Sequence, residues 1–152
     1  MADALTAVED WAAAFLNRLE PGERRVLAGQ IARELRRSQV ARIAAQENPD
    51  GSAFKARKPQ PRKLRDKIGT IKRGPMFKKL RLAQRLKIIE ASGQQIAIGF
   101  TGRDAHIARV HQDGLAQKVG TRMVTYPQRR LLGITEADSS HLMDTVLAFL
   151  DK

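Results

Sequence analysis

The chain of 152 residues contains no cysteine, which excludes both a disulfide framework and a cysteine-ligated zinc site. Aromatic residues make up only 5% of it, and the longest apolar run near the N-terminus covers residues 11–16. Asp3, Glu9 and Asp10 stand where a secretory signal would carry positive charge. We therefore expect no secretory or membrane segment, and a protein made in, and soluble in, a cytoplasm. This length, with 42% hydrophobic residues, suits one domain with a real core.

Groups that could perform catalysis or bind a metal are equally scarce. His106, His111 and His141 are the only histidines, and the spacing of the first two puts them on opposite sides of a helix, so they form no ligand pair. The sequence His111-Gln112-Asp113 is accompanied by no nucleophile motif, glycine-rich phosphate loop or paired carboxylates. We therefore predict no enzymatic activity, no cofactor and no metal, and we interpret His111 as a packed or hydrogen-bonded residue.

What the chain has in excess is positive charge, and that charge is localised. Residues 55–87 hold 14 Lys and Arg against one acid, whereas the other residues hold 14 bases and 15 acids. A localised block indicates a specific contact with a partner rather than general solubility. The candidate residues for subunit or DNA contact are Lys55, Arg57, Lys58, Arg62, Lys63, Arg65, Lys67, Lys72, Arg73, Lys78, Lys79 and Arg81.

Most of these cations lie in residues 55–75, where prolines and glycines interrupt the sequence and neither a helical nor a strand period is present. Such a stretch cannot bury enough apolar surface to offset its ordering entropy, which predicts an extended or flexible arm. Two uses of the arm are open. It can bind DNA phosphates, with a log–log salt slope of roughly −0.9 per phosphate, or pair with acidic surfaces of neighbouring subunits. Phe54 and Phe77 only flank it, so base stacking on single strands is not supported.

The remaining patterns predict a single α+β domain spanning residues 1–152: two N-terminal helices, the arm, a small antiparallel sheet with an inserted helix, and a C-terminal helix. The expected elements are helices 3–19 and 21–46, a type I turn at 48–51, a helical turn after Pro75, a hairpin of strands 86–91 and 95–100, a helix 104–112 ended by Gly114, a loop 115–121, and a strand 123–125.

The apolar face of the expected helix 21–46 rotates along its length, from Leu27 to Ile43. Such a helix can pack against two different partners, which are either two parts of the fold or the fold and a neighbouring chain. Alternatively, it can twist around a single core. Its polar side carries four arginines, interpreted as a solvated face: Arg33, Arg36, Arg37 and Arg42.

Residues 126–142 are the stretch on which the rest of the fold depends. Pro127 favours an extended conformation at Tyr126, and Gly133 permits a bend or a close backbone approach. Thr135, followed three residues later by Asp138, is a capping-box pattern that predicts the start of the last helix. Its apolar positions fall on one face: Leu142, Val146, Phe149 and Leu150.

Four motifs occur in a characteristic order: residues 31–39, residues 48–51 with Phe54 and Arg57-Lys58, residues 107–115 and residues 126–133. In these motifs the chain resembles the phage virion morphogenesis, or tail completion, family. The resemblance implies a non-enzymatic protein that finishes the tail of a contractile-tailed phage or prophage at the head-proximal end, as a tail terminator or neck protein in head–tail joining. It also implies a homo-oligomeric ring of six subunits or a multiple of six. The implied partners are tail tube, sheath and neck or connector proteins.

The same resemblance implies assembly in the host cytoplasm, with the virion as the later location. An alternative that the residues leave open is a nucleic-acid-binding module that uses the basic residues 55–87 on DNA.

Overall fold

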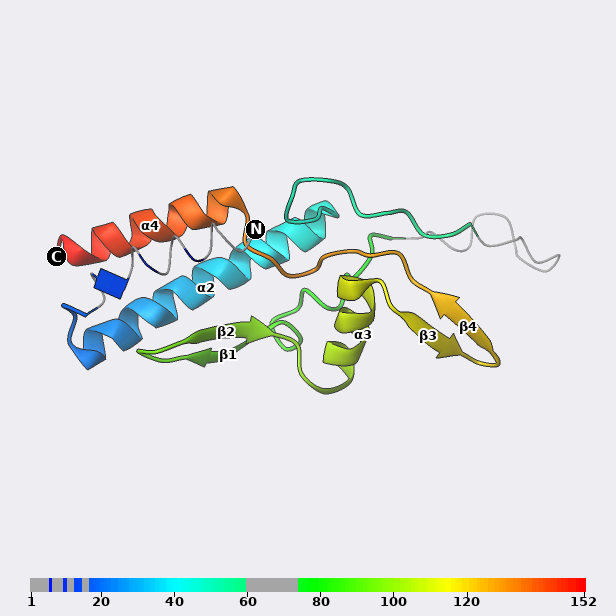
Figure 1. Ribbon diagram of the computed structural model, residues 1–152, viewed down its shortest axis with the longest axis horizontal. Helices are drawn as coiled ribbons and strands as arrows, with labels where there is room; N and C mark the ends of the chain where they lie inside the picture. The colour runs from blue at the N-terminus through cyan, green and yellow to red at the C-terminus, as the bar shows by residue number, and fades with distance from the viewer. Residues whose placement is uncertain (1–5, 7–9, 11–12, 15–16, 60–73) are drawn as a thin grey trace.

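The computed structural model describes residues 6, 10, 13–14, 17–59 and 74–152. Along the chain these form α2 (Pro21–Ala45), β1 (Lys87–Ala91), β2 (Ile96–Gly99), α3 (Gly102–Asp113), β3 (Ala116–Val119), β4 (Arg122–Thr125) and α4 (Glu136–Leu150) (Figure 1). The α+β class is therefore confirmed. Most of the helix expected at 3–19 lies outside the described residues, although residues 6, 10, 13 and 14 are helical.

The long helix α2 has the bounds that the sequence predicts. Pro21 occupies its first turn, where a missing amide hydrogen costs nothing, and the Glu20 amide donates to Glu23 Oε2 over 2.9 Å. At the other end Gln46 adopts the left-handed conformation with φ 64°, and its amide bonds back to the last turn. The expected turn follows, closed by a hydrogen bond of 2.9 Å from the Gly51 amide to the Asn48 carbonyl.

Helix α4 lies beside α2, as Figure 1 shows. Its predicted capping box is present, because the Asp138 amide donates to Thr135 Oγ1 (3.0 Å) and the Thr135 amide donates to Asp138 Oδ2 (2.9 Å). Asp138 also accepts a hydrogen bond from Ser38 Oγ on α2. Of the predicted apolar stripe, Leu142 and Val146 are buried. The cap therefore both starts α4 and fixes it to α2.

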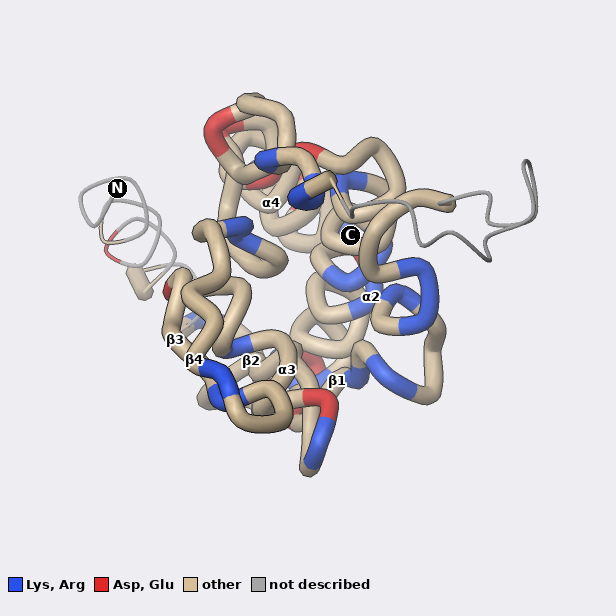
Figure 2. The backbone as a smooth tube through the Cα atoms, turned by 90° about the vertical axis from the view of Figure 1, so that its right-hand side faces the viewer, with Lys and Arg blue, Asp and Glu red and all other residues tan. Residues whose placement is uncertain are grey.

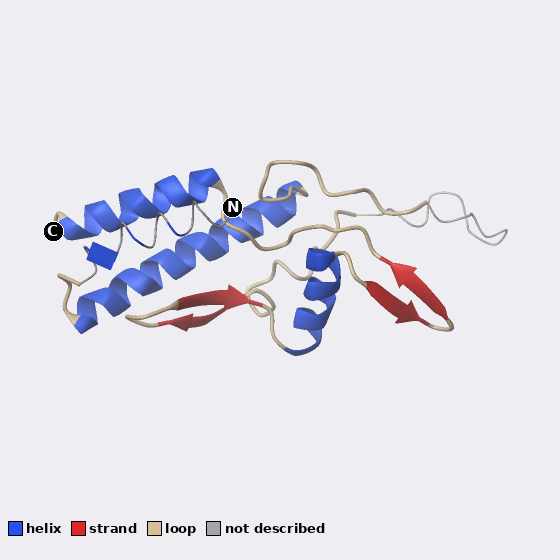
Figure 3. Cartoon of the chain, viewed as in Figure 1, coloured by secondary structure: helices blue, strands red, loops and turns tan. Residues whose placement is uncertain are grey.

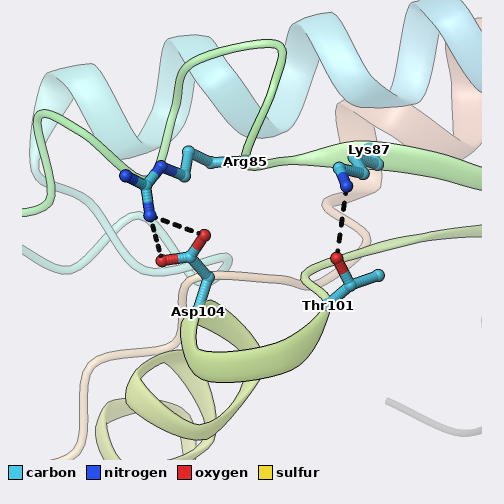
Figure 4. A network of polar contacts seen from close by, with 4 residues as sticks. All are labelled: Arg85, Lys87, Thr101 and Asp104. Carbon is cyan, nitrogen blue, oxygen red and sulfur yellow. Dashed lines mark hydrogen bonds and ion pairs between the residues drawn. The ribbon is translucent and has the colours of Figure 1, made fainter.

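Strands β1 and β2 form the expected antiparallel hairpin, with a register irregularity between Ile88 and Glu90. Arg85 Nη1 lies 2.7 and 2.9 Å from the two carboxylate oxygens of Asp104, in the first turn of α3 (Figure 4). Next to this ion pair, Lys87 Nζ donates a hydrogen bond to Thr101 Oγ1 over 3.4 Å. These contacts join the base of the hairpin to the start of α3, and an acid in a first helical turn also suits the helix dipole.

The loop prediction for 115–121 is wrong. Strands β3 and β4 pair with each other as a second two-stranded sheet, separate from β1–β2 (Figure 3). Gly120, with φ 62°, supplies the turn between them. Strand β3 was not predicted because its polar residues do not alternate with apolar ones, whereas the strand expected at 123–125 is confirmed as β4. Residues 76–81 form consecutive turns where the sequence predicts a helical turn, and Leu80 is buried there.

The main core lies where the C-terminal half of α2 meets the segment that precedes α4. It consists of Ile43, Phe54, Leu80, Leu86, Phe100, Ala108 and Leu131. Leu27 and Ala28, in the N-terminal half of α2, are buried on the side of α4 and the β1–β2 turn. The rotating apolar face of α2 thus meets two different parts of the fold. Helix α3 buries Ala108 and Val110 and leaves Ile107 37% exposed.

Candidate functional site

The 126–133 segment crosses between α2 and α3 without regular secondary structure (Figure 1). A Cβ placed on Gly133 would lie 2.4 Å from Cγ of Pro49, so the predicted close backbone approach is confirmed. Beside it, the Arg130 amide donates to Asn48 Oδ1 over 2.8 Å. The turn that ends α2 and the segment that leads to α4 therefore fit directly against each other.

Side-chain amides take the place of a neighbouring strand along this segment. Gln112 of α3 donates from Nε2 to the Leu132 carbonyl (2.8 Å) and accepts at Oε1 from the Leu132 amide (3.0 Å). Gln39 of α2 accepts from the Gly133 amide over 3.1 Å. Backbone groups near a core must find partners, and here both neighbouring helices supply them.

Arg42 is buried, so the prediction of a solvated arginine face is wrong at this position. Its guanidinium donates to the carbonyls of Glu47 (3.2 Å), Arg130 (3.0 Å) and Leu131 (3.0 Å). Burial lowers the pKa of Arg42, and the Asp138 carboxylate partly opposes that shift. The only sign in the sequence that Arg42 is buried is its position next to Ile43, on the part of α2 where the apolar face has rotated.

The other three arginines of that face divide into two kinds. Arg36 is partly buried, and its Nε donates to the Leu86 carbonyl over 2.7 Å. Arg33 and Arg37 are exposed, as predicted.

The same region holds the first residues of the basic arm. Arg129 is only 3% exposed, and it donates from Nε to the Lys55 carbonyl (2.7 Å) and from Nη2 to the Ala56 carbonyl (3.2 Å). Its amide donates to the His111 carbonyl over 2.7 Å. Burial lowers the pKa of Arg129, and the nearby Arg57 guanidinium lowers it further. The buried guanidinium of Arg129 therefore binds backbone carbonyls of the arm and is not exposed to solvent.

Four rings connect the two ends of the arm to the body. Phe54 and Phe77 are 5.8 Å apart between centroids, Phe77 and His111 are 4.8 Å apart, and His111 and Tyr126 are 4.9 Å apart, each pair edge to face. Phe54 precedes the arm and Phe77 follows it. Arg57 Nη1 also donates to the Gly74 carbonyl over 3.1 Å, which brings the two ends of the arm together.

We call this region the arm root, and define it by residues 54–57, residues 74–77, His111, Tyr126 and Arg129. His111 is packed and within hydrogen-bonding distance of Arg129, with Nδ1 at 3.4 Å from Nη1, as the sequence predicts. Burial, reinforced by the charge of Arg129, lowers the pKa of His111 to about 4. The ring is therefore neutral at pH 7, which avoids a second positive charge next to the guanidinium.

The structure places only some of the candidate contact residues. Lys55, Arg57 and Lys58 are exposed on one side of the arm root, and Lys78 and Lys79 are exposed where the chain re-enters the body. Arg81 is half-buried. The other candidates lie outside the described residues: Arg62, Lys63, Arg65, Lys67, Lys72 and Arg73. Figure 2 views the molecule from the end at which β3 and β4 lie, with Lys and Arg in blue and Asp and Glu in red.

The described part of the chain contains no set of three or more His, Asp or Glu side chains arranged to hold a metal ion. None of its helices combines the length and the apolar character that crossing a bilayer requires.

Residues 3–151 match the model of the phage virion morphogenesis family. The chain belongs to this family. Tail completion protein S of Escherichia phage P2 is 37% identical to it over 147 residues, which are 95% of each chain. No solved structure matches the chain. In this phage virion morphogenesis protein, three of the motifs that carry the resemblance meet at one place: residues 48–54, 107–115 and 126–133 all contribute to the arm root or to the segment beside it.

Proposed function

We propose that this member of the phage virion morphogenesis family is a non-enzymatic structural protein that completes the phage tail at its head-proximal end. It acts there as a tail terminator or neck protein in head–tail joining. The observation that carries the proposal is the identity of 37% to a tail completion protein over nearly the whole of both chains. The protein works as a homo-oligomeric ring of six subunits or a multiple, assembled in the host cytoplasm and then part of the virion.

The basic arm is the part of the molecule that reaches a neighbour. Its two ends are held together by Arg129, Arg57 and the ring contacts, so the arm leaves the body and re-enters it at one place. A segment fixed at both ends loses less entropy when it becomes ordered against a partner than a free tail does. The neighbour is an adjacent copy, the tail tube or sheath, or a neck or connector protein.

The second candidate is a nucleic-acid-binding module that uses residues 55–87 on DNA, and the charge of that stretch favours it. Two observations weigh against single-stranded targets. Phe54 is buried and Phe77 packs on the core, so neither ring offers a face to a base. Contact with duplex DNA that passes through the ring is compatible with the first proposal.

A complementation experiment tests the function. A phage or prophage whose own copy of this chain is disrupted is supplied with the wild-type chain or with a variant carrying Lys55→Glu, Lys78→Glu and Lys79→Glu, three exposed positions at the arm root and just after it. We expect the wild type to restore joined heads and tails, counted by electron microscopy. The variant should fold, because these side chains are exposed, but should leave tails unfinished.

The matched control carries Arg25→Glu, Arg33→Glu and Arg37→Glu, which change the net charge equally at exposed positions of α2. It should complement like the wild type. Joined particles formed without the chain would refute the function. Normal complementation by the arm variant would refute the role of the arm, and loss of tails together with a salt-dependent loss of duplex binding would favour the DNA module.

A further inference from the structure

The β3–β4 hairpin forms a two-stranded sheet of its own, separate from β1–β2. A two-stranded hairpin is at best marginally stable alone, and Figure 1 shows this one projecting at the end of the molecule. Only its Gln117–Val124 pair is half-buried, on the face toward α3. Its apolar side chains are unusually open to solvent, with Met123 67% and Val119 50% exposed. Apolar surface on a projecting element indicates a docking site.

The charge on this hairpin has one sign. Lys118 pairs with Met123 across the strands, Arg122 pairs with Val119, and all four side chains are exposed. Residues 114–125 contain no acid. The surface is therefore apolar and cationic together, and its complement is a surface that is apolar and anionic.

Helix α4 offers such a surface at the other end of the molecule. Asp144, Leu147 and Asp151 are exposed, and at 100° per residue they fall within one face. Leu147 is 44% exposed. The helix contains no Lys or Arg, and Asp151 stands at its C-terminal end, where the helix dipole favours cations. Lys152 follows Asp151, with its Nζ 5.8 Å from the centroid of the Phe149 ring, and a positive charge from another molecule would add to its effect at this end of the helix.

We propose that the β3–β4 hairpin of one copy docks on the outer face of α4 in the next copy, with Lys118 and Arg122 toward Asp144 and Asp151, and Met123 toward Leu147. The inference deepens the proposed ring and rests on it. The two patches differ and lie at opposite ends of the long axis (Figure 1), so the contact is heterologous and repeats from subunit to subunit. DNA would satisfy the two cations but would leave Met123 and Val119 uncovered.

The hairpin is not the whole interface. Stable interfaces use about 20–30 residues a side, many more than two four-residue strands supply. The cations of the arm root lie next to the hairpin, since Arg57, Val124 and Thr125 line one pocket. Arg57 at the arm root and the hairpin can therefore approach the same neighbour.

Charge reversal with rescue tests this contact. One variant carries Lys118→Glu and Arg122→Glu, a second carries Asp144→Lys and Asp151→Lys, and a third carries all four changes. Sedimentation velocity on nuclease-treated full-length chain, at a salt concentration of about 0.1 M, gives the size of each. We expect an oligomer for the wild type, monomers for the first two variants, and recovery of the oligomer when the changes are combined. The control Arg33→Glu with Arg37→Glu should remain oligomeric.

The inference is overturned if the wild type sediments as a monomer at the highest concentration reached, if either paired variant keeps its size, or if the combined variant stays dissociated. Loss of duplex binding by the hairpin variant without a change in size would assign the hairpin to DNA instead. If the sizes do not change while tails still depend on the chain, only the docking mode fails. If tails are completed without the chain, the proposed function fails.

Discussion

At the scale of single residues, the segment before α4 is fixed by contacts of two kinds. Gly133 was predictable, because a glycine between apolar residues marks a bend or a close approach, and it meets Pro49. The roles of Gln112 and Arg42 were not, because a polar side chain on a helix reads as solvated unless the backbone carbonyls around it are known. Whether a polar side chain is buried depends on the whole fold, whereas the need for a glycine can be inferred from the neighbouring residues in the sequence.

Gly133→Ala should lower the free energy of unfolding by about 1–3 kcal/mol, as overpacking does, because the new methyl group would sit 2.4 Å from Cγ of Pro49. Chemical denaturation followed by circular dichroism measures the change. The control is Gly22→Ala in the first turn of α2, where no atom lies within 4 Å of the added carbon and stability should not fall. Equal stability of the two variants would contradict the close approach.

The stability of the protein should depend on pH through His111. Its pKa is about 4 in the folded protein against 6.5 for the ordinary group, so the unfolded chain binds about one more proton between these values. The contribution is complete above pH 6.5 and is lost as the pH falls toward 4. The denaturation midpoint should rise with pH across this range in the wild type and in His106→Phe. It should rise less steeply in His111→Phe. The same slope in all three proteins would rule out a buried neutral ring.

At the scale of elements, α4 and strand β4 could be predicted, but strand β3 and its pairing with β4 could not. The start of α4 is predicted by the capping-box pattern of Thr135 and Asp138. This pattern is local and requires no knowledge of the rest of the fold. Strands β3 and β4 have four residues each, and their pairing depends on a register that hydrophobic alternation does not specify. The arm root was missed for a third reason, because its rings come from positions 54, 77, 111 and 126, which only the fold brings together.

Thr135→Ala removes the hydroxyl that accepts from the Asp138 amide, and it should lower the free energy of unfolding by about 1 kcal/mol. The matched control is Ser140→Ala, at an exposed position within α4, where the change should stay within about 0.5 kcal/mol. Thermal or chemical unfolding of both variants gives the comparison. If the two substitutions cost the same, the cap does not fix the start of α4.

At the scale of the whole molecule, the surplus of positive charge lies in residues 55–87, and the rest of the chain is nearly balanced. Sequence reasoning could locate the charge, because counting Lys and Arg along the chain needs no coordinates. It could not show that Arg129 is buried beneath the arm and holds the backbone of Lys55 and Ala56. The body fixes where the arm begins and ends, and we propose that a neighbouring protein determines the path between those points.

Hydrogen exchange on residues 55–75, compared between the isolated chain and the chain assembled into tails or rings, tests this most directly. We predict that the amides of the isolated chain exchange at nearly the rate of an unprotected peptide and become protected on assembly. The amides of Ile43 and Leu131 in the core provide the internal control and should be protected in both states. Strong protection of residues 55–75 before assembly, unchanged afterwards, would contradict the claim that a partner orders the arm.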